Sequence, residues 1–155
     1  MNTKSPNDFG KMRIINENFT LNNIDIILWE VLRIDKIQRI KIRFTKPNSS
    51  NRQGIRIGVD SSDGYMIINN IKAKSFELWE DTCPKEIEVE CHSDEGYLSI
   101  YNIFERNEQG IMRKHSQMAY SGMILERNEN VYKYSCNDTG YSTSFDKLVF
   151  EVELL

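Results

Sequence analysis

The stretch that decides the fold is 75-SFELWEDTCPKEIEVECHSDEGYLSIYNIF-104. From Lys85 to Cys91, apolar residues alternate with glutamates, and a second alternation runs from Tyr97 to Tyr101. Turn-forming residues, 93-SDEG-96, stand between the two runs. This pattern predicts a β-hairpin with one apolar face and one solvated face. Such a hairpin is typical of an antiparallel sheet that is half exposed to water.

The rest of the chain repeats short apolar runs between turn signals. An alternating strand is expected at Ile37–Thr45, a hairpin over Gly122–Cys136 and a final strand at Leu148–Leu154. The segment Ile24–Ile34 fits helical spacing, but its β-branched and aromatic residues favour a strand. We therefore predict an all-β fold, an antiparallel β-sandwich resembling a jelly roll, with about eight to ten strands and at most one short helix. Residues 105–118 lack a period and predict a long loop, either a functional loop or a plain connection.

Length and composition predict one domain of ordinary globular character. The chain has 155 residues, 39% hydrophobic and 28% charged, with a net charge of −3. We expect a flexible arm at residues 1–11 and a single domain at 12–155. The mild acidity argues against a nucleic-acid partner. Neither a membrane span nor an export signal is expected, and three cysteines without metal-type spacing indicate a reducing cytoplasm.

No motif indicates an enzyme. A nucleophile site built from Cys136, His115 and Asp138 is conceivable, but sequence does not show whether they meet. The turn aspartates are explained by turn chemistry without calcium. The sequence therefore predicts no catalytic residue, no metal and no cofactor.

The predicted outer faces offer two binding surfaces. One carries Glu86, Glu88 and Glu90. The other carries tyrosines, namely Tyr97 and Tyr101 on one strand and Tyr132 on another. Exposed tyrosines can stack on a sugar or anchor a protein, although cross-strand pairing that stabilises the sheet is the alternative.

The C-terminal half carries several short motifs in order: 98-LSIYNIFE-105, 120-YSGMILE-126, 134-YSCNDTG-140 and 145-FDKLVFEVEL-154. Over about residues 75–155 the chain resembles a family of small bacterial β-rich proteins without an assigned function. The resemblance implies no catalytic residue. It implies a shared polar corner, which consists of Asn102, Ser121, Gly122, Cys136, Asn137 and Asp138.

Three functions follow as hypotheses, in this order. The first is a non-enzymatic cytoplasmic protein-binding module, for example an immunity-type protein whose acidic face neutralises a basic toxin. The second is a sandwich that binds a carbohydrate or another small ligand. The third is an enzyme that uses the 105–118 loop with His115 and the Asn137–Asp138 corner. We expect an unidentified protein partner, and self-association through a sheet edge is a further hypothesis.

Overall fold

A computed structural model describes residues 11–59 and 63–155, and strands are its only regular elements. The predicted arm therefore lies outside the described residues, except for Lys11. The strands are β1 (Ile14–Ile15), β2 (Ile27–Arg33), β3 (Ile37–Phe44), β4 (Arg52–Gly58), β5 (Tyr65–Ile68), β6 (Ile71–Ala73), β7 (Ser75–Trp79), β8 (Glu86–His92), β9 (Tyr97–Glu108), β10 (Ile111–His115), β11 (Gly122–Asn128), β12 (Val131–Asn137) and β13 (Leu148–Leu154). The all-β prediction is confirmed, but thirteen strands form in the described ranges in place of the predicted eight to ten.

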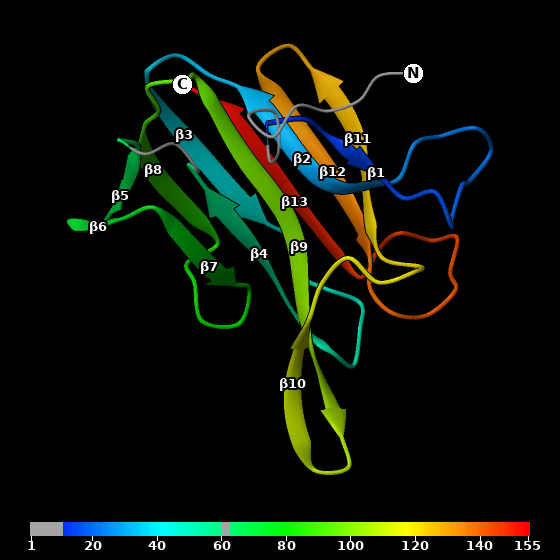
Figure 1. The fold of residues 1–155 in the computed structure, drawn as a ribbon. Coiled ribbons are helices and arrows are strands. Elements are labelled where there is room, and N and C mark those ends of the chain that lie inside the picture. Colours follow the sequence, from blue (N-terminus) through cyan, green and yellow to red (C-terminus); the bar gives the residue numbers. More distant parts are fainter. Residues whose placement is uncertain (1–10, 60–62) are drawn as a thin grey trace.

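All thirteen strands belong to one hydrogen-bonded sheet rather than to two separate sheets. Its order is β6-β5-β8-β3-β13-β12-β11-β2-β9-β4-β7, with β1 beside β2 and β10 beside β9. The sheet curls into a nearly closed barrel (Figure 1). At the seam, Leu78 of β7 and Ile87 of β8 line one small cleft although their strands do not pair. The antiparallel part of the prediction is confirmed, because every pairing between strands is antiparallel.

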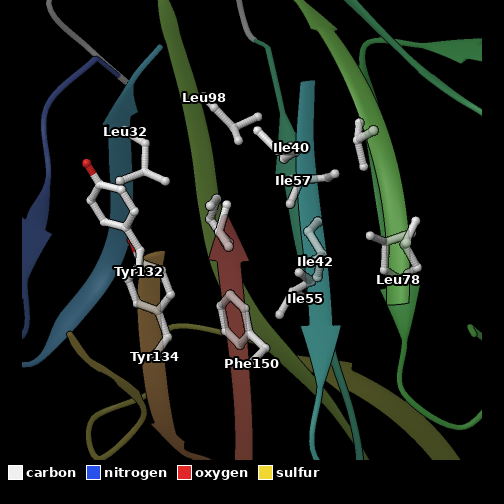
Figure 2. Close-up of a cluster of buried hydrophobic side chains, with 14 of the residues drawn as sticks. Leu32, Ile40, Ile42, Ile55, Ile57, Leu78, Leu98, Tyr132, Tyr134 and Phe150 are labelled. Carbon is white, nitrogen blue, oxygen red and sulfur yellow. The ribbon is translucent and has the colours of Figure 1, made fainter. Parts of the chain in front are cut away.

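The core fills the inside of the curled sheet. On β3, Ile40 and Ile42 are fully buried, whereas Arg39 is exposed, as the alternation predicted. Figure 2 shows side chains of β3 and β4 pointing toward one another in this core. The period-2 pattern of the sequence therefore reports correctly which face of each central strand is buried.

The predicted 75–104 hairpin is wrong in its pairing, although both of its strands exist. Strand β8 pairs with β3 and β5, whereas β9 pairs with β2, β4 and β10. The turn does form, and Ser93 Oγ accepts hydrogen bonds from the backbone of Gly96 and Tyr97. It leads the chain to a different part of the sheet. Alternation identifies a buried face, but it does not identify the neighbouring strand.

The predicted loop at 105–118 is also wrong. Strand β9 continues to Glu108 and returns as β10, and the two form an arm that projects from the body (Figure 1). The turn residues Gln109 and Gly110 have φ angles of 54° and 85°, as a type I′ hairpin turn requires. Because Ile111 and Met112 are both exposed on this arm, no apolar face exists to create an alternating pattern.

The remaining segment predictions are confirmed. The ambiguous piece at Ile24–Ile34 contains strand β2, not a helix. Strands β11 and β12 form the expected hairpin, with Gly122 opposite Asn137. Strand β13 matches the predicted final strand, with alternating burial.

Candidate functional site

The glutamates of β8 face solvent, but they are not a free acidic surface. Glu88 pairs with Arg39 at 2.7 Å, and Glu86 pairs with Arg43 at 3.1 Å. The Arg43 guanidinium also contacts Glu153, and this hydrogen bond is the main reason why the pKa of Arg43 is raised. Cross-strand arginines thus balance two of the three glutamates on which the predicted acidic face depended.

The predicted tyrosine face is wrong at two positions. Tyr97 is 2% exposed and Tyr132 is 9% exposed, so both are buried. Tyr132 shares the inward phase of β12 with Tyr134. Tyr101 is half-buried and stacks on Trp29 with ring centroids 5.2 Å apart. Tyr101 therefore serves cross-strand packing, which was the alternative to an exposed binding face.

His115 is engaged within the β9–β10 arm. Its Nε2 lies 2.7 Å from Glu108 Oε1, and its ring stacks on Phe104. Asn137 and Asp138 form their hydrogen bonds with other residues. Burial raises the pKa of the Cys136 thiol well above its usual value, which disfavours a thiolate nucleophile. The structure thus offers no contact that joins the residues of the enzyme hypothesis.

The structure brings three residues of the expected polar corner together, namely Asn102, Gly122 and Asn137. Asn102 Nδ2 donates to the carbonyl oxygen of Asn137 at 3.0 Å. Gly122 faces Asn137 across the β11–β12 pair. A side chain at Gly122 would meet the carbonyl oxygen of Ile27 at 2.9 Å, so only glycine permits this approach of β2.

Asp138 ties this corner to β4 and to the segment before it. Its Oδ2 accepts hydrogen bonds from Ser49 Oγ, Asn51 Nδ2 and Gln53 Nε2 at 2.7, 3.1 and 3.0 Å. Asp138 is only 4% exposed, and three donors offset the cost of burying its carboxylate. Its place in the structure is therefore explained by anchoring a loop.

Two buried amides fix the neighbouring loops from inside. Asn137 Nδ2 donates to the carbonyl oxygens of Tyr120 and Gly140, at 2.7 and 2.6 Å. Asn16 Nδ2 donates to the carbonyl oxygens of Ala119 and Ser121, at 2.9 and 3.0 Å. Loops 16–26, 117–121 and 138–147 therefore hold a defined arrangement, although they contain little regular structure.

These loops present two exposed aromatic residues, Tyr120 and Tyr141, which we together call the loop surface. Their side chains are 41% and 71% exposed. The Tyr120 and Tyr141 rings meet edge to face at 5.6 Å, and both contact Phe19. Phe19 is itself buried and stacks on Phe145. Phe19, Ile26 and Phe145 form a small second core, and the loop surface is its exposed continuation.

The backbone beneath the loop surface is unusual. Phe145 is a bulky residue with a φ of 48°, in the left-handed region that such residues avoid. Asn22, Asn23 and Gln117 in the adjoining loops are also left-handed. Strained backbone of this kind persists where the surrounding structure determines it, and it concentrates at binding sites.

Sequence reasoning missed Tyr120 and Tyr141, because the search was for tyrosines in strand phase. Both lie beside turn residues, in 119-AYSG-122 and 139-TGYS-142. An aromatic residue inside a run of Gly, Ser and Thr is the signal that would have found them, since loops carry many binding residues.

The described ranges contain no group of three His, Cys, Asp or Glu side chains able to hold a metal ion. Nor do they contain a helix that is long and apolar enough to cross a membrane. No family model, curated protein or solved structure matches the chain. The loop surface must therefore be interpreted from its own chemistry, which is aromatic contact area with phenol hydroxyl groups.

Proposed function

We propose that the chain is a protein-binding module that holds its partner on the loop surface. The observation that carries this proposal is the pair of exposed tyrosines, Tyr120 and Tyr141, on a buried aromatic base. Tyrosine is enriched among the residues that dominate binding energy at protein interfaces. A large exposed aromatic residue with this support is better explained by a partner than by folding alone.

Preorganisation supports the same proposal. The hydrogen bonds of Asn137 and Asn16 order the loops before any partner arrives. A partner then loses less free energy to the ordering of loops on binding. The edge-to-face arrangement of the two rings also favours a protein, because a sugar ring stacks on one flat aromatic face.

This proposal includes an immunity-type role, in which the partner is a toxin. The binding surface is then the loop surface and not the glutamates of β8. The original hypothesis placed a basic toxin on the glutamates of β8, and Arg39 and Arg43 compete for two of them. The rings of Tyr120 and Tyr141 contact Phe19 and each other, and both side chains remain exposed. We therefore expect a partner that offers an apolar pocket for Tyr141 rather than a basic patch.

The test is affinity isolation from extracts of the native cell with matched variants. We expect a stoichiometric partner with the wild-type protein that is lost with Tyr120→Ser/Tyr141→Ser. The control is Glu86→Gln/Glu88→Gln, which alters an equally exposed surface and should retain the partner. A partner that depends on the glutamates and tolerates the tyrosine changes would contradict the proposal.

A further inference from the structure

A cleft with an excess of positive charge lies where β3 and β13 end their pairing. The last paired residues are Phe44 and Phe150, and Thr45 then binds the carbonyl oxygen of Val149. Two adjoining hollows of about 430 and 400 Å³ open here, and both are lined by Phe44 and Lys85. Each has the volume of a small-molecule site.

The lining combines lysines with apolar side chains. Lys46 and Cys83 line the first hollow. Lys133, Val149 and Phe150 line the second. Across the two hollows, the cations Arg43, Lys46, Lys85 and Lys133 face the carboxylates Glu80 and Glu151. The cleft is therefore locally positive, although the whole chain has a net charge of −3.

The three lysines of this cleft differ from most cations elsewhere in the protein. Arg39, Arg43, Arg52, Lys114 and other cations of the described ranges lie within 4.0 Å of carboxylates. No ion pair found in those ranges includes Lys46, Lys85 or Lys133. Arg43 is already engaged by Glu86, Glu151 and Glu153. The lysine ammonium groups are thus the cations left to meet a ligand.

We infer that this cleft binds a small organic anion, with its charged group on Lys85 and Lys133 and its apolar body against the partly exposed side chain of Val149. Lysine provides compact ammonium donors that suit phosphate, sulfonate and carboxylate oxygens. The partly exposed side chains of Val149 and Cys83 favour a ligand with an aromatic or aliphatic part over a free inorganic anion. This site is separate from the loop surface and does not depend on the proposed function.

The probe is 8-anilinonaphthalene-1-sulfonate, an aromatic sulfonate whose fluorescence rises in apolar surroundings. We expect saturable binding that Lys85→Gln/Lys133→Gln weakens at least tenfold. The matched control, Lys36→Gln/Lys72→Gln, removes two cations that do not line the cleft and should leave the affinity unchanged. Circular dichroism of each variant checks that it folds. Inorganic phosphate should displace the dye, and the uncharged N-phenyl-1-naphthylamine should bind at least tenfold more weakly.

Cys83 provides a local readout, because it lines the first hollow and is the only partly exposed cysteine. Bound dye should slow its alkylation in the wild-type protein but not in Lys85→Gln/Lys133→Gln. Equal dye affinity in that variant and in the wild type would overturn the inference. Dye binding that is lost instead with Tyr120→Ser/Tyr141→Ser would also overturn it, by assigning the dye to the loop surface.

Discussion

Replacing Asn137 by alanine tests whether a buried amide holds the loop surface together. The change removes two hydrogen bonds and leaves the carbonyl oxygens of Tyr120 and Gly140 without that donor. An unsatisfied buried acceptor costs about 1–3 kcal/mol, and these two bonds are only partly buried. We therefore expect a loss of roughly 2–4 kcal/mol in the free energy of unfolding. For a domain of this size, that corresponds to a fall in Tm of roughly 5–15 °C.

Urea unfolding followed by tryptophan fluorescence measures this loss, with calorimetry as a second assay. Asn130→Ala is the matched control, because its Nδ2 makes one hydrogen bond, to the Leu154 carbonyl oxygen, in an exposed setting. We expect the control to lose less than about 1 kcal/mol. If Asn137→Ala were as stable as Asn130→Ala, the loops would not depend on this amide, and the account of their order would be refuted.

Three further predictions concern individual side chains. Glu30 is fully buried and pairs with Arg13 at 2.8 Å, so Arg13→Met should lower the free energy of unfolding in urea by about 2–4 kcal/mol. Arg39→Met breaks an exposed ion pair and should lower it by less than about 1 kcal/mol. Cys83 should be the only thiol of the folded protein to react with an aromatic disulfide reagent at pH 8, and reaction of a second thiol without unfolding would contradict the structure. Burial raises the pKa of Tyr134 far above its ordinary 10.0, so as pH rises the unfolded chain loses this proton before the folded protein does. The free energy of unfolding should therefore fall as pH rises above about 10. Tyr134→Phe should make this fall less steep, by up to about 1.4 kcal/mol per pH unit.

Much of the fold could be predicted because burial leaves a period in the sequence. The central strands β3, β8 and β13 each have one face in the core and one in water, and their alternation is plain. The β9–β10 arm was missed because neither of its faces is buried. Pairing was missed at the β8–β9 turn because a turn motif does not specify whether the two strands become neighbours.

The site was less predictable for a related reason. The hydrogen bonds of Asn137 and Asp138 show that both side chains anchor loops, a role that their turn-type sequence alone did not specify. The exposed tyrosines follow from how three distant loops meet, which no local pattern records. Tyr132 shows the opposite error, because it was expected on an exposed face and is buried. The alternation in β12 did not by itself show which of its two faces points into the core.

The most direct test of the central claim is photo-crosslinking from the loop surface in the native cell. p-Benzoylphenylalanine would replace Tyr141, which is 71% exposed, and in a parallel variant Ile71, which is 62% exposed on β6. We predict one crosslinked protein partner from position 141 and none of that size from position 71. Crosslinking of the same partner from position 71 and not from position 141 would contradict the claim that the loop surface holds the partner.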